Sequence, residues 1–186
     1  MLNRAVRSEI PRMLGRRVET LYFDILQFLY HLALAVLVGG MLVLGTAVAP
    51  ALFGRRDSYS REPPAVTRTQ AGALFGAVLA RFDGYAILAL VVLVVTSALK
   101  SSFEVTGTPE PRLAARWVIL LFLALATLYS SAWANPVARS IRKATAGFDD
   151  LPAGAPARVE FARLHQRSRR AMSVAAVLGL LALFLS

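Results

Sequence analysis

Long apolar runs without charged residues dominate the pattern of this chain. Residues 25–53 contain no lysine, arginine, aspartate or glutamate over 29 positions. About 20 such residues are enough to cross the hydrocarbon core of a bilayer. Two further runs, 84–99 and 117–133, are equally apolar, and tryptophans stand at both ends of the second, where membrane proteins carry their aromatic belts. The pattern predicts three membrane-spanning helices.

A fourth span is predicted over residues 171–185, which are apolar but number only 15. This helix reaches full length if it begins near Val159, with its arginines extending their side chains toward the membrane surface. Pro136 is expected to kink or end the third helix, because proline has no backbone N–H to donate. The expected fold is therefore all-α, a single domain over residues 21–186 built as a four-transmembrane-helix bundle.

Residues 1–20 have a different character and carry five arginines. Their apolar residues recur every four positions, at Leu2, Val6, Ile10 and Leu14. This spacing places them on one helical face and predicts a basic amphipathic N-terminal helix that lies on the membrane surface.

The composition supports a membrane protein, since 56% of the residues are hydrophobic and only 17% charged, against about a quarter charged in soluble domains. The absence of cysteine excludes thiolate metal ligands and a cysteine nucleophile. The net charge of +10 is expected at lipid headgroups, so the bilayer is the predicted partner and nucleic acid is not. Four spans place both termini on one side of an inner membrane. The Lys and Arg count slightly favours termini outside the cytoplasm, although the N-terminal arginines oppose this.

A titratable residue inside the first apolar run, His31, draws attention because such groups are costly in a membrane. It belongs to a stripe on one helical face that is expected to look into the bundle, formed by Asp24, Gln27, His31, Ala35 and Gly39. His31 is interpreted either as a haem or metal ligand or proton relay, or as a neutral histidine hydrogen-bonded within the bundle. The second histidine, His165, precedes the fourth span on the opposite side. A separation of about 20 Å or more in depth excludes a haem bound by both.

Two further groups of polar residues are candidates for a site. Thr127, Ser131 and Asn135 form a stripe on the third helix, which either lines a path for a small molecule or proton or bonds neighbouring helices together. Arg81 and Asp83 interrupt the apolar residues of the second helix. We expect them to lie near the interface and to form a salt bridge with another helix.

Small residues at four-residue spacing predict close helix packing. The second helix carries Gly72, Gly76, Ala80 and Gly84, and the first helix carries Gly39. Ridges of this kind let two backbones approach closely in a membrane.

Several short motifs follow one another along the chain. They are His31, Gly39-Gly40, the APALF run at 49–53, Trp133-Ala-Asn-Pro136 and Phe161-x-x-Leu-His165-x-x-Ser168. In this order they resemble the bacterial four-helix membrane domain of unknown function related to transmembrane protein 205, over about residues 22–186. The resemblance implies that both histidines lie at positions marked by the family pattern. That family has no assigned biochemistry.

The motifs that commonly mark enzymes do not occur, among them glycine-rich phosphate loops and HExxH. The leading hypothesis is a non-enzymatic protein of the inner membrane that acts as a structural or accessory subunit of a larger membrane assembly. One alternative is a haem- or metal-binding redox or transport protein with His31 as ligand. Another is a carrier that uses the stripe from Thr127 to Asn135.

Overall fold

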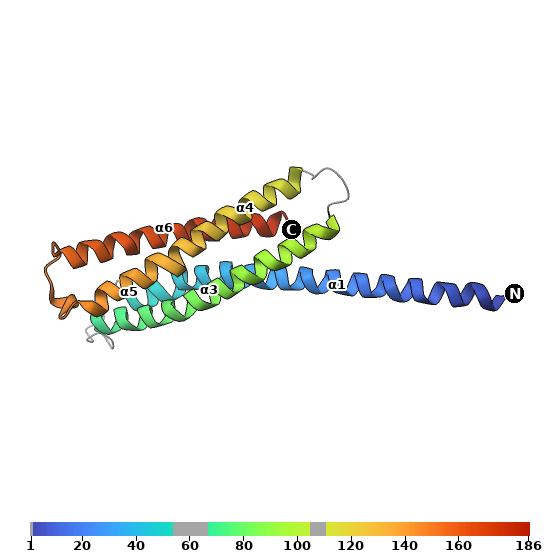
Figure 1. The fold of residues 1–186 in the computed structure, drawn as a ribbon. Helices are drawn as coiled ribbons and strands as arrows, with labels where there is room; N and C mark the ends of the chain where they lie inside the picture. The colour runs from blue at the N-terminus through green and yellow to red at the C-terminus, as the bar shows by residue number, and fades with distance from the viewer. Residues whose placement is uncertain (1, 54–66, 105–110) are drawn as a thin grey trace, which may run out of the picture.

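The computed structural model describes residues 2–53, 67–104 and 111–186, and within these the secondary structure is helical. Long helical stretches lie side by side and run alternately in opposite directions (Figure 1). The longest elements are α1 (Leu2–Val43), α3 (Arg68–Glu104), α4 (Pro111–Thr127), α5 (Asn135–Ala144) and α6 (Pro156–Phe184). The predicted all-α class is confirmed.

Three helical stretches are long and apolar enough to cross a membrane. They are Glu19–Phe53, Thr69–Ser102 and Pro111–Ala144, and they contain the three long apolar runs of the sequence. The second continues through Arg81 and Asp83 as one helix, because α3 has 37 residues and a length of about 55 Å. The helix α6 forms where it was expected but is not one of these three stretches, so a fourth span stays a prediction.

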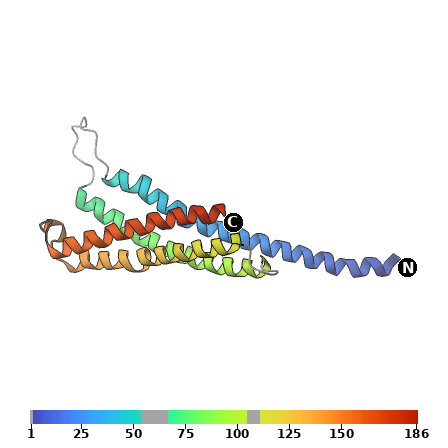
Figure 2. The same ribbon diagram turned by 90° about the horizontal axis from the view of Figure 1, so that it is seen from above.

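The N-terminal segment is not separated from the first span by a break. The helix α1 runs without interruption through residues 20 and 21, and its first turns extend well past the other helices (Figures 1 and 2). The predicted boundary at residue 20 therefore falls inside one helix. The amphipathic face from Leu2 to Leu14 concerns side chains outside the described part of the chain.

Two short π-helical segments widen the helices next to prolines. The first, η1 (Leu44–Val48), leads into α2 (Ala49–Phe53), which contains Pro50. The second, η2 (Leu128–Ala134), joins α4 to α5 just before Pro136. Pro136 does not end the third helix as one expectation had it, because the helical path continues to Ala144. Proline has no backbone N–H, and the wider π turn before it lets the helix continue although that hydrogen bond is missing.

The core lies where α1 packs against α3 and α6, and where α4 packs against α6. Its fully buried large side chains include Tyr30, Leu34, Leu37, Leu93 and Leu123. The outward side chains are also large and apolar, with Phe28, Leu88 and Val177 each more than half exposed. An apolar outer surface of this kind suits a lipid environment, in which lipid tails replace water around the protein.

Candidate functional site

A chain of buried polar side chains connects three helical stretches. Asn135 donates from Nδ2 to Oδ1 of Asp83 at 2.8 Å, and Arg139 pairs with the other carboxylate oxygen at 2.5 Å. Ser168 donates from Oγ to Oδ1 of Asn135 at 2.5 Å, and its oxygen lies 2.7 Å from Oγ of Ser130. We call these five residues the Asp83 network. Because the Ser168 proton points to Asn135, the Ser130 hydroxyl acts as the donor to Ser168.

The network forms at one depth because of where the apolar runs stop. Asp83 directly precedes the run 84–99, Asn135 follows the run 117–133 by two residues, and Ser168 precedes the run 171–185 by three. Since α3 and α6 enter the bundle at the end where the third helix leaves it, all three residues lie at the same end of the bundle.

The widened turn of η2 brings two residues of one helical path to the same partner. The backbone N–H of Asn135 bonds to the carbonyl of Ser130, five residues earlier. This π-type turn places Ser130 and Asn135 on the same side of the helix, where both contact Ser168 of α6. A regular turn would align residues three or four apart instead. The π segment thus positions the centre of the network.

Burial makes these bonds costly to lose. Asp83, Ser130, Asn135 and Ser168 are all at most 4% exposed, whereas the Arg139 side chain is 28% exposed. A buried carboxylate is tolerated when a cation and hydrogen-bond donors compensate it. Arg139 and Asn135 provide these to Asp83 from the same helix, four residues apart. The predicted salt bridge of Asp83 with another helix is confirmed, and its partner is Arg139.

The predicted stripe on the third helix faces the interior. Thr127, Ser131 and Asn135 are all buried, and Asn135 belongs to the Asp83 network. The Thr127 hydroxyl has no hydrogen-bond partner among the described residues. The structure thus joins one member of the stripe to α3 and α6.

His31 lies near the opposite end of the bundle and is half-buried. Its Nδ1 is 2.8 Å from the carbonyl of Gln27, and its Nε2 is 3.0 Å from the Ser186 hydroxyl. Its ring stands edge-on to that of Tyr30, which is fully buried. Both ring nitrogens therefore have partners within the chain.

The stripe that contains His31 faces the bundle only in part, whereas its composition predicted that the whole stripe would do so. Asp24 and Ala35 are exposed, and a Cβ built on Gly39 would meet nothing within 4 Å. The buried face of α1 lies beside this stripe and consists of Leu26, Tyr30, Ala33, Leu34, Leu37, Val38 and Met41. Of the predicted stripe, Gln27 and His31 are half-buried at the edge of this face, and the amide oxygen of Gln27 has no partner in the described structure.

His165 lies far from His31. It precedes the end of α6 by about 20 residues, and that end of the chain contacts His31 through Ser186. The two imidazoles are therefore about 30 Å apart, in agreement with the expected separation. His165 stacks on Phe161 with ring centroids 5.9 Å apart. Burial, and secondarily the charge of Arg169, lowers the pKa of His165.

The ridge of small residues on α3 is largely directed outward rather than into the bundle. Ala80 and Gly84 are exposed, and a Cβ on Gly76 or Gly84 would meet nothing within 4 Å. Among the three glycines of the ridge, a Cβ would meet a described neighbour at Gly72 alone, namely the Arg142 side chain. At these outward positions the described structure shows no helix packed closely against the ridge, so the predicted close approach of another helix stays a prediction.

Two other glycines make the close approaches. A Cβ on Gly40 would overlap the ring of Phe82, and one on Gly179 would overlap the Val38 side chain. The sequence marked Gly40 only as a neighbour of Gly39. Gly179 carried no signal beyond being a small residue in the last apolar run.

The sequence analysis also missed most of the Asp83 network. Ser130, Arg139 and Ser168 were not singled out as site residues. One signal for them was available, because polar residues stand at the same end of three apolar runs. Lys100 at the other end was missed as well. It is buried, and its ammonium lies 5.7 Å and 5.5 Å from the ring centroids of Phe23 and Tyr30.

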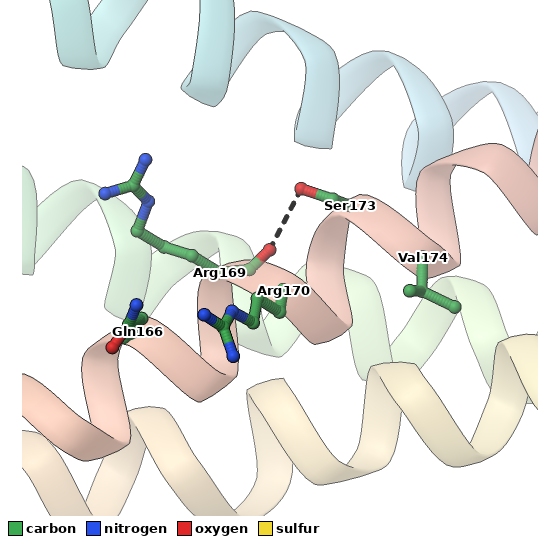
Figure 3. A pocket seen from close by; sticks show the side chains of 5 residues that line it. All are labelled: Gln166, Arg169, Arg170, Ser173 and Val174. Atoms are coloured by element: carbon green, nitrogen blue, oxygen red, sulfur yellow. Dashed lines mark hydrogen bonds between the residues drawn. The ribbon is translucent and has the colours of Figure 1, made fainter.

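An open cavity of about 560 Å³ lies on the surface of α6, directly after His165 in the sequence, and the side chains that line it are all exposed. It is lined by residues of α6 alone, namely Gln166, Arg169, Arg170, Ser173 and Val174 (Figure 3). Within the described residues there is no group of three His, Cys, Asp or Glu side chains placed to hold a metal ion.

Comparison with known families gives one match. The profile described as "Domain of unknown function (DUF4149)" matches residues 32–146. This region includes α3, α4, η2 and α5, and hence Asp83, Asn135 and Arg139, while His31 and Ser168 lie outside it. Neither the curated proteins nor the solved structures yield a match to this chain.

Proposed function

The chain belongs to the family of the domain of unknown function DUF4149, and we propose that it is a non-enzymatic membrane protein that serves as an accessory subunit of a membrane assembly. The observation that carries this proposal is the Asp83 network. Its carboxylate, amide and hydroxyl groups are bonded to one another across α3, η2, α5 and α6. A reaction or transport site directs polar groups at a substrate, whereas these hold helices together.

The proposal includes four spans, with α6 crossing the membrane through residues 171–185. Two features of α6 support this. It lies beside α4 and ends next to His31, so it runs along the bundle. Its second half also has exposed apolar side chains, among them Val177 and Phe184. Four spans place both termini on one side. The Lys and Arg count slightly supports termini outside the cytoplasm. The order of the short motifs supports kinship to the bacterial four-helix membrane domain of unknown function related to transmembrane protein 205.

The outward ridge on α3 supports the assembly part of the proposal. Gly76, Ala80 and Gly84 leave a shallow strip on a helix that also exposes large side chains, such as Tyr85 and Leu88. In a membrane, such a strip permits the close approach of a second helix. We propose that a helix of a partner subunit packs there.

Gentle solubilisation with native lipids tests this proposal. We expect the full chain to migrate as part of a larger complex, and we expect Gly84→Leu to release it. Ala77→Leu adds the same side chain at an exposed position of α3 beside the ridge and serves as the matched control. A lone monomer from wild-type membranes, with no partner captured by cross-linking before solubilisation, contradicts the accessory role.

The two alternative functions conflict with contacts that are present. A haem or metal at His31 requires one ring nitrogen to leave Gln27 or Ser186. A carrier that uses the stripe on the third helix requires Asn135 to leave Asp83 or Ser168. The visible spectrum of the purified protein tests the first alternative, because a Soret band that His31→Ala abolishes would support a haem-binding redox or transport protein in place of the accessory subunit.

A further inference from the structure

The open cavity on α6 is lined by two cations that form no ion pair within the described part of the chain. Arg169 and Arg170 both border it, and neither forms a salt bridge with a described carboxylate. Arg139, Arg142 and Arg163 differ in this respect, since they pair with Asp83, Asp149 and Glu160. Two positive charges therefore border the same space without compensation.

Three of the side chains that line this cavity carry N–H groups that can donate hydrogen bonds. Figure 3 shows Arg169 and Arg170 diverging from α6, with Gln166 one turn earlier on the same helix. Guanidinium groups present several N–H donors in a plane, which suits the oxygens of a phosphate. The Ser173 hydroxyl donates to the carbonyl of Arg169 at 3.0 Å, so its oxygen faces the cavity as an acceptor. The chemistry favours a phosphate-type anion that also carries a hydroxyl.

The wall of the cavity changes character along the helix. Val174 borders it on the apolar side, and the exposed residues Val177 and Leu181 continue the same helical face away from the arginines. The arginines directly precede the apolar run 171–185, where a proposed span would meet the headgroup layer. A ligand that fills the site thus needs an anionic head and an apolar tail.

We propose that this cavity binds one anionic phospholipid. Arg169 and Arg170 hold its phosphate, Gln166 donates to the headgroup, and an acyl chain lies along Val174, Val177 and Leu181. A free phosphate would use the arginines but not the apolar face. The phospholipid uses both, which is why we assign it in preference to a soluble anion. The proposal does not depend on the accessory role.

The test uses the full chain in neutral detergent micelles, titrated with phosphatidylglycerol, phosphatidylcholine or inorganic phosphate, with bound lipid counted by native mass spectrometry. We expect phosphatidylglycerol to be retained by the wild type, and Arg169→Gln with Arg170→Gln to weaken retention about tenfold or more. Phosphatidylcholine is expected to bind at least tenfold more weakly than phosphatidylglycerol.

The matched control is the double variant Arg163→Gln with Arg167→Gln. It removes the same charge from exposed positions of the same helix that do not line the cavity, and we expect it to retain phosphatidylglycerol as the wild type does. Equal loss in both double variants would show general charge attraction and overturn the site. Inorganic phosphate that displaces phosphatidylglycerol at millimolar concentration would overturn the lipid assignment.

Folding of the variants is checked independently. Arg169→Lys with Arg170→Lys keeps both charges, and we expect its retention of phosphatidylglycerol to fall between the wild type and the glutamine pair. If the glutamine double variant fails to fold, the lysine double variant becomes the test of the site. Retention of phosphatidylglycerol equal to that of the wild type would then contradict binding by the guanidinium groups.

Discussion

The two ends of the bundle carry buried polar groups of different kinds. At one end, His31 contacts its own helix and the last residue of the chain. At the other end, the Asp83 network joins the second, third and last helices through side chains that are almost fully buried. At the first end, one half-buried histidine has a single side-chain bond to another segment, Ser186. At the second end, several almost fully buried side chains are bonded to one another across three helical stretches. A polar residue that stands alone in an apolar run is easy to notice in a sequence. Its structural importance, however, depends on the buried hydrogen bonds that it forms with other helices.

The largest predicted effect is at the Asp83 end. Arg139→Ala leaves a buried carboxylate without its cation, and we expect a loss of about 3 kcal/mol in the free energy of unfolding. Equilibrium unfolding in mixed micelles measures it. Arg142→Ala is the control, because its carboxylate partner, Asp149, is considerably more exposed than Asp83, and this ion pair is expected to contribute less than about 1 kcal/mol. Equal effects of the two variants would remove the distinction between a buried and a surface pair.

The neighbouring glycines of α1 offer a second comparison. Gly40→Leu forces the buried Phe82 ring, next to Asp83, out of its place, and we expect a loss of about 2 kcal/mol. Gly39→Leu projects into open space and is expected to leave stability unchanged. The same unfolding measurement applies to both. A larger effect at Gly39 would mean that the stripe of His31 faces the bundle after all.

A smaller effect is predicted at Ser168. Replacement by alanine leaves the side-chain amide oxygen of Asn135 and the Ser130 hydroxyl without their partner. Hydrogen bonds between membrane helices are worth about 1 kcal/mol. We expect Ser168→Ala to lower the unfolding free energy by that amount. Ser173→Ala, at an exposed position on the same helix, is expected to have no measurable effect. An unchanged free energy of unfolding in Ser168→Ala would show that the network tolerates the loss of this hydroxyl group.

The smallest effect is predicted at His31. His31→Ala removes a half-exposed side chain that bonds to the end of the chain, so we expect a loss of about 0.5 kcal/mol or less. Thermal unfolding of the variant beside the wild type is sufficient to detect a larger change. A loss similar to that of Arg139→Ala would make the two ends equivalent.

The difference between prediction and structure has a physical cause. The sequence was sufficient to predict the long helices, because the length of an apolar run reports directly on membrane crossing. It was not sufficient to predict which face of each helix is buried. In a membrane the lipid-facing side is as apolar as the core, so periodicity does not separate the two. For this reason the stripe of His31 was assigned to the interior, although Asp24 and Ala35 are exposed.

The candidate site was predictable only in part. Asn135 was identified because polar residues inside an apolar run usually bond to another helix. Its hydrogen-bond partners depend on two features. The π turn of η2 brings Ser130 to the same side of the helix as Asn135, and the ends of three helical stretches lie at the same depth. Neither is visible in local sequence patterns. Asp83 was noted, but its partner Arg139 lies 56 residues away and could be found only from the packing.

A double-mutant cycle between Asp83 and Arg139 tests the central claim most directly. The variants Asp83→Ala, Arg139→Ala and the double variant are compared with the wild type by equilibrium unfolding in mixed micelles. If the Asp83 network holds the helices together, each single change destabilises strongly, and the double change costs little more than one of them. The coupling energy is then about 1.5 kcal/mol or more. Additive effects, with a coupling energy near zero, would contradict the account.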